Sequence, residues 1–111
     1  MDRVAVEQTA LTLAEITAVE VERYAGTSPF AKYYALLDEK RQRYTVIEIE
    51  DERTDESVCV TVMARVVDDF IVIEEDTFFD KPLYEALMVN GGVPRDKIIL
   101  AYKGEKLPES P

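Results

Sequence analysis

Apolar and polar residues alternate with two different periods along the chain, and the change of period predicts its elements. Between Val4 and Tyr24 the chain contains no Gly or Pro, and its apolar residues recur at spacings of three or four, which is typical of an amphipathic helix. Four glutamates are predicted to lie mostly off the apolar face: Glu7, Glu15, Glu20 and Glu22. The apolar stripe is wide enough to contact a sheet on one side and a second surface on the other, such as another copy of the chain.

The helix is predicted to stop at Ala25–Pro29, where Gly26 is a candidate left-handed cap and Pro29 prevents continuation. The next segment, Phe30–Asp38, suits either a strand or a short helix, and its context favours a strand.

A period of two then begins and predicts a sheet. Tyr44–Glu50 alternates cleanly and is expected to bury Tyr44 and Val46, with Ile49 as a further candidate. Two further segments rich in β-branched residues follow, Val58–Val67 and Phe70–Glu75. They are joined by short polar segments, a solvated loop over Glu50–Ser57 and a turn at Asp68-Asp69, so we expect an antiparallel meander of about four strands.

A second helix and a final strand complete the expected fold. Asp80 is the candidate N-cap, Pro82 suits the first turn, and Gly91-Gly92 ends the helix by allowing positive backbone dihedrals. Lys97–Tyr102 is predicted to form the last strand, and residues 103–111 a polar tail that frays. The order of elements predicts an α+β fold in a single domain over residues 1–111.

The charge of the chain limits its partners. Thirteen Lys and Arg against 23 Asp and Glu give a net charge of −10. Such a surface repels phosphate, so direct binding to nucleic acid is not expected. The acidic surface either binds a basic protein partner or simply keeps the protein soluble.

Cysteine and histidine usage narrows the chemistry further. Cys59 is the only cysteine, is predicted to be a buried strand residue, and has no histidine in the chain to pair with. An intrachain disulfide, a Cys/His dyad and a Cys/His zinc site are therefore excluded, and no cofactor is expected. The first residues lack a basic leader with an apolar block, and no apolar run approaches the ~20 residues of a membrane span, so we expect a cytoplasmic protein that does not contact membranes.

The abundant carboxylates raise the possibility of a metal-dependent nuclease site, drawn from Asp68, Asp69, Glu74 and Asp76. Asp68-Asp69 is also the residue type expected in a hairpin turn, and no lysine follows at the spacing familiar in nucleases, so the structural interpretation is favoured. Gly91-Gly92 follows a helix and is therefore a cap, not a phosphate-binding loop. The chain is not expected to be an enzyme on its own.

Several short motifs resemble a known family. They are Leu37-Asp38 followed by Arg41 and Tyr44, the strand Asp69–Asp76, Gly92-Val93-Pro94, and Ile98–Tyr102. In this order they are similar to the XisI-like family, the controlling factors for excision of the fdxN DNA element, over about two thirds of the chain, with this chain as a divergent member.

The resemblance implies a non-catalytic accessory protein that acts with a companion, XisH, in controlling excision of a DNA element. We further hypothesise that the acidic surface docks on a basic partner and that residues around Arg41, Tyr44 and Asp76 serve folding or that interface. Self-association is expected from the two-sided helix. A small acidic chaperone of secretion type is the competing hypothesis, and it would hold an extended segment along a sheet edge or helix groove. The metal-dependent nuclease is a weaker one.

Overall fold

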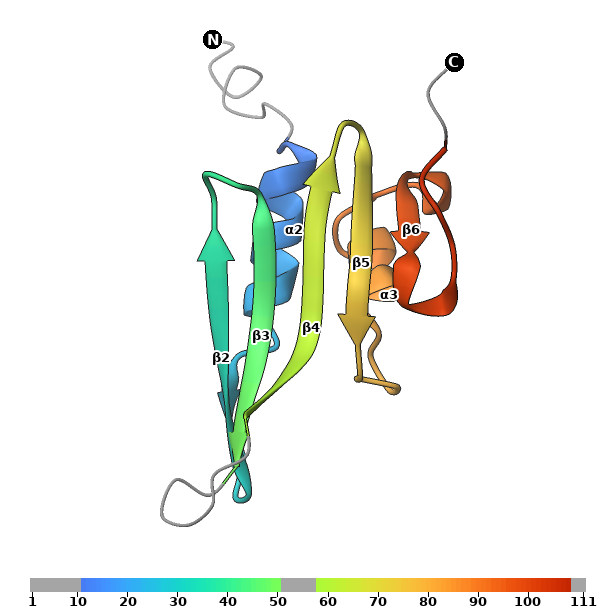
Figure 1. Ribbon diagram of the computed structural model, residues 1–111. Coiled ribbons are helices and arrows are strands. Elements are labelled where there is room, and N and C mark those ends of the chain that lie inside the picture. Colours follow the sequence, from blue (N-terminus) through green and yellow to red (C-terminus); the bar gives the residue numbers. More distant parts are fainter. Residues whose placement is uncertain (1–10, 51–57, 109–111) are drawn as a thin grey trace, which may run out of the picture.

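The computed structural model describes residues 11–50 and 58–108, which form two α-helices against a six-stranded sheet (Figure 1). In chain order the elements are α2 (Leu13–Glu22), β1 (Gly26–Thr27), β2 (Ala31–Asp38), β3 (Arg43–Glu50), β4 (Val58–Val67), β5 (Phe70–Asp76), α3 (Leu83–Val89), and β6 (Ile98–Leu100) between the short 3-10 turns Arg95–Lys97 and Ala101–Lys103. The predicted α+β class is confirmed, and so is the strand favoured for Phe30–Asp38. The predicted loop at Glu50–Ser57 lies almost wholly outside the described residues.

The strands are arranged in the order in which they occur in the chain, β1-β2-β3-β4-β5-β6. Each pair from β1 to β5 is antiparallel, which confirms the meander, and β6 joins the edge parallel to β5. Helix α3 supplies the crossover that parallel neighbours require. The two-residue strand β1 was not predicted, because Gly26-Thr27 carries no strand pattern of its own.

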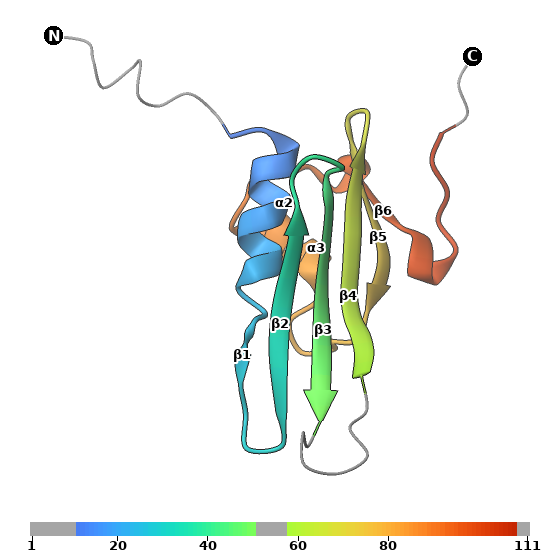
Figure 2. The same cartoon turned by 60° about the vertical axis from the view of Figure 1, so that its left-hand side comes forward.

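Both helices lie on one face of the sheet, and no helix lies on the other face of β2–β4 among the described elements (Figures 1 and 2). The core is formed where the helix-facing residues of the strands meet the helices. Tyr44 and Val46 lie directly opposite Ala64 and Val62, and all four are essentially inaccessible to solvent. The prediction that Tyr44 and Val46 are buried is therefore confirmed, whereas Ile49 lies on the opposite face, since β3 alternates regularly.

Helix α2 begins later than the sequence pattern predicts. The Thr12 hydroxyl accepts a hydrogen bond from the Glu15 N–H, and the Glu15 carboxylate accepts one from the Thr12 N–H, which is a complete capping box. This cap starts the helix at Leu13 instead of Val4, and residues 4–10 lie outside the described residues. The expectation that Glu20 lies off the buried face is wrong, because its side chain packs between the helices and Glu20 is only 4% exposed.

The start of α3 also differs from its prediction. Pro82 occupies the N-cap position and makes no side-chain cap, and Asp80 is exposed, so Asp80 is not the cap. The carboxylate that accepts the first helical N–H, from Leu83 at 2.7 Å, belongs to Asp76 at the end of β5. At the other end Gly92 has the positive φ of 69° that was predicted for the glycine pair.

The C-terminal segment is more firmly held than the sequence indicates. Glu105 accepts a hydrogen bond from the Leu100 N–H at 2.8 Å and pairs with Arg95 at 2.7 Å. Together with the 3-10 turn at Ala101–Lys103, this contact ends β6 after three residues and ties down the beginning of the predicted polar tail. Residues 109–111 are not described.

Cys59 is exposed, so its predicted burial is wrong. It lies near the start of β4, which reaches beyond the helices toward the end of the sheet (Figure 1).

Candidate functional site

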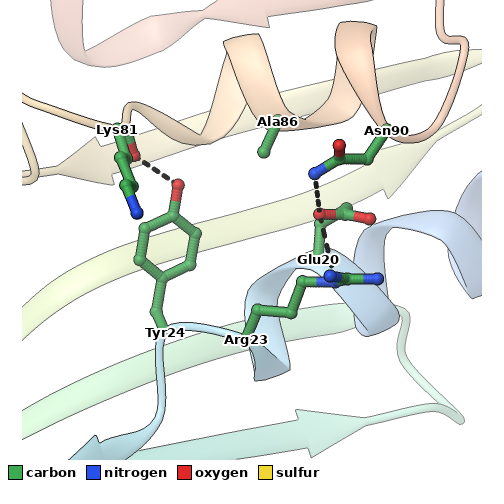
Figure 3. Close-up of a pocket in the computed structure, with 6 residues that line it drawn as sticks. All are labelled: Glu20, Arg23, Tyr24, Lys81, Ala86 and Asn90. Carbon is green, nitrogen blue, oxygen red and sulfur yellow. Dashed lines mark hydrogen bonds and ion pairs between the residues drawn. The ribbon is translucent and has the colours of Figure 1, made fainter.

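A groove runs between the C-terminal end of α2 and α3, from Lys81 just before α3 to Asn90 at its C-cap (Figure 3). It encloses about 330 Å³ and is lined by Glu20, Arg23, Tyr24, Lys81, Ala86 and Asn90. An adjoining hollow of about 540 Å³ shares three of these residues, and its other walls come from residues 77–80. We call the two together the interhelical groove.

Glu20 forms the acidic floor of the interhelical groove. Asn90 donates an amide hydrogen bond to its carboxylate at 3.1 Å, and the Arg23 guanidinium lies 3.5 Å from the same oxygen (Figure 3). A buried carboxylate is tolerated only when it is paired and hydrogen-bonded, and both conditions are met here. The contact joins residues 70 positions apart in the chain and so holds α2 to α3.

Tyr24 forms the wall that separates the two parts of the groove. Its hydroxyl donates a hydrogen bond to the Lys81 carbonyl, and its ring lies 4.8 Å from that of Phe78. Burial raises the pKa of the Tyr24 hydroxyl well above its usual value, and the carboxylates of Asp76 and Glu20 add to the shift. The hydroxyl therefore remains protonated and acts as a hydrogen-bond donor.

The loop between β5 and α3 presents the largest exposed aromatic side chain beside the groove. Phe79 is 92% exposed, whereas its neighbour Phe78 packs on the core. Asp76 supports this loop from below, because its carboxylate accepts the N–H groups of Phe78 at 3.0 Å and Leu83 at 2.7 Å. Burial raises the pKa of the Asp76 carboxyl, although the two N–H donors oppose that shift.

The three residues that the sequence placed in folding or partner binding do not converge on one site. Arg41 is exposed in the β2–β3 turn, where its backbone N–H donates to the Asp38 carboxylate at 3.0 Å and its guanidinium pairs with it at 3.1 Å. The backbone hydrogen bond first, and then the side-chain one, hold the pKa of Asp38 below its usual value. Tyr44 is buried in β3 and contributes to a smaller hollow of about 240 Å³ beside α2. Of the three, Asp76 lies nearest the interhelical groove. Each stabilises the fold locally: Arg41 in the turn, Tyr44 in the core and Asp76 under the β5–α3 loop. Their part in a partner interface stays a prediction.

The carboxylates considered as metal ligands are dispersed over one hairpin. Asp68 and Asp69 form the β4–β5 turn, and the length of β5 places Asp76 about 20 Å away. Glu74 is engaged by Arg65 at 2.9 Å. Among the residues that the structure describes, no group of three or more His, Cys, Asp or Glu side chains is arranged to hold a metal ion.

The groove combines fixed polar groups with an exposed aromatic ring, a composition that suits recognition of a protein surface. Within the described ranges, no helix is long and apolar enough to cross a membrane. The fold and the groove thus define a small α+β protein whose sheet is covered by helices on one face. The chain belongs to the XisI family, described as XisI protein, which its sequence matches over residues 1–109.

Solved structures agree with this assignment. A XisI-like protein from Anabaena variabilis ATCC 29413 superposes with a TM-score of 0.65 at 20% identity, over 78% of this chain and 81% of that protein. The fdxN element excision controlling factor XisI from the same organism superposes with a TM-score of 0.53 at 17% identity, over 79% of each chain. At these identities the likeness establishes the fold. No curated protein matches the chain.

Sequence reasoning missed most of the groove. Glu20 was placed off the buried face because glutamate ordinarily lies in solvent, and its burial depends on Arg23 and on Asn90, which follows a distant helix. Phe79 carried no clear signal in the sequence, because a single apolar residue in a polar segment between two elements is ordinary at a protein surface.

Proposed function

We propose that this protein is a non-catalytic accessory factor that controls excision of a DNA element by contacting a companion protein of the XisH type. Membership in the XisI family supports the connection with excision. The fdxN element excision controlling factor that shares its fold supports the same connection. The net charge of −10 favours a basic protein partner over direct contact with DNA.

The observation that carries the proposal is the exposure of Phe79 beside a groove of fixed shape. An aromatic side chain in solvent gains most when it enters a pocket on a partner, and such anchors dominate protein interfaces. Arg23 and Lys81 at the rim supply donors for the carbonyl and carboxylate groups of that partner. The competing chaperone function would hold an extended segment along a sheet edge or in a helix groove, and the interhelical groove is as accessible to such a segment as to the companion.

Replacing Phe79 with alanine is expected to weaken binding to the companion at least tenfold, because truncation of an anchoring aromatic side chain removes about 2 kcal/mol of binding free energy. The measurement is capture of the chain by the tagged XisH-like companion, followed by titration calorimetry of the purified pair.

Phe30→Ala is the matched control, since Phe30 is 84% exposed and does not line the groove. It should leave the affinity unchanged. Equal affinities for the wild type and Phe79→Ala would show that the groove is not the docking site. Failure of the companion to capture the wild-type protein would overturn the proposed function.

A further inference from the structure

We infer that the sheet face opposite the helices is a self-association surface, on which a second copy of this chain packs sheet against sheet. We call this surface the open face. Cross-strand pairs in register share a face, so the register assigns its members. Its apolar members on three adjacent strands are Tyr34, Leu36, Ile47, Ile49, Val58, Val60 and Met63.

Exposure distinguishes this set from ordinary surface residues. Leu36 is 52% exposed and Val58 57% exposed, and Tyr34 and Val60 are also among the exposed large apolar residues. They are contiguous, because Tyr34 lies opposite Ile47, which lies opposite Val60. A contiguous apolar patch of this kind marks an interaction surface, whereas scattered apolar residues do not.

The charge of the open face points to a second copy as its occupant. The register and the ion pairs place six charged strand residues of the described chain there, three of each sign: Lys32, Arg43, Arg65, Asp38, Glu74 and Glu75. They sum to zero, although the whole chain carries −10. A basic companion would gain nothing from a neutral patch, whereas two acidic copies can approach closely only through a surface without excess charge.

Distance supports the same choice of occupant. Face-to-face sheets lie ~10 Å apart, so the charges of the two open faces meet directly. The rim of the patch is polar and includes the ion-pair group of Arg43 and Arg65 with Glu74. A two-fold axis would let such a mixed rim pair with itself.

The available area suits a weak dimer. The three exposed strands β2 to β4 project about 400 Å² at ordinary strand spacing and rise, because Val72 of β5 is buried on this face. A stable interface uses about 800 Å² per partner, so we expect the dimer to dissociate in the micromolar range. Edge-to-edge pairing along residues 34–38 of β2, which β1 leaves unpaired, is the alternative geometry, and Val58→Lys on β4 distinguishes it because Val58 lies away from that edge.

The test is sedimentation equilibrium of the full chain between about 1 and 100 μM. We expect the wild type to reach twice its mass of 12.6 kDa. Leu36→Lys and, separately, Val58→Lys should raise the dissociation constant at least tenfold, because each puts a charge into the contact. Val89→Lys is the matched control, since Val89 is 81% exposed on α3, and it should associate like the wild type.

Raising the salt concentration should strengthen the dimer, because it screens repulsion between two acidic chains. Circular dichroism checks that each variant is folded, and two independent sites protect the test against one misfolded variant. A wild type that remains monomeric at 100 μM, or Leu36 and Val58 variants that associate normally, would overturn the inference. It does not depend on the proposed function, since Phe79 lies outside the open face and its variants should dimerise normally.

Discussion

Replacing Asp76 with alanine is expected to lower the free energy of unfolding by about 3 kcal/mol, because two backbone N–H groups lose their acceptor in a protected site. The Leu83 N–H is buried and the Phe78 N–H is partly buried, and both donate to this one carboxylate. Alanine also removes the group that aligns the β5–α3 loop with the first turn of the helix. Urea unfolding monitored by circular dichroism measures the loss.

Asp80→Ala is the matched control for this prediction. Asp80 stands in the same loop, bears the same charge and was the cap predicted from the sequence, yet it is exposed and the helix start has no side-chain cap from it. Its replacement should change stability by less than about 0.5 kcal/mol. A larger effect of Asp80→Ala than of Asp76→Ala would contradict the capping role assigned to Asp76.

The pH dependence supplies a second test of Asp76. Burial raises the pKa of its carboxyl above the ordinary 3.8. A carboxyl whose folded pKa exceeds its unfolded pKa binds protons more tightly in the folded state, so its stabilising contribution is present at low pH and declines as the pH rises through the folded pKa. The free energy of unfolding of the wild type, relative to that of Asp76→Asn, should therefore fall as the pH rises from the unfolded pKa of the carboxyl to its higher folded pKa. A relative stability that rises with pH would contradict the shift.

Among the residues of the motifs shared with the family, those that stabilise the fold can be distinguished from those that contact a partner. Asp38 and Arg41 build the β2–β3 turn, Tyr44 fills the core behind it, and Asp76 supports the loop under the groove. A loss of companion binding in Asp76→Ala would therefore reflect a displaced β5–α3 loop. Phe79→Ala removes only the exposed side chain and leaves the hydrogen bonds between Asp76 and the loop intact.

Local patterns were sufficient to predict most elements of the fold. Alternation identified β3 and β4, and Asp68-Asp69 marked their continuation into β5, since these signals depend on neighbouring residues only. The start of α2 was placed too early because apolar spacing continues through residues 4–12, and the capping box at Thr12 is a stronger determinant of the boundary than periodicity.

The groove and the open face could not be predicted in the same way. The groove depends on the Glu20–Asn90 contact between two helices, and the open face depends on the register of three strands. The sequence does not say which face Val58 and Val60 occupy, because β-branched residues suit either face of a sheet. Their exposure follows from the placement of both helices on the other face (Figure 2).

Replacing Gly91 with alanine is expected to lower the free energy of unfolding by about 2 to 3 kcal/mol through overpacking between the helices. An added Cβ would lie 2.5 Å from the Cγ2 of Ile16 in α2 and 2.8 Å from the Leu87 carbonyl oxygen. The clash with Ile16 pushes α3 away from α2, and the clash with the Leu87 carbonyl, which is backbone of α3 itself, distorts the last turn of that helix. The strain should therefore also disturb the Glu20–Asn90 contact that closes the groove.

A double-mutant cycle distinguishes this clash from a simple loss of backbone freedom. In an Ile16→Ala background the cost of Gly91→Ala should fall by about 1 kcal/mol, because one of its two close neighbours is gone. Gly92→Ala is the control, since its cost arises from a φ of 69° in open space and should be the same in both backgrounds. If the cost of Gly91→Ala were independent of Ile16, the approach of α2 to α3 would not be what requires a glycine at position 91.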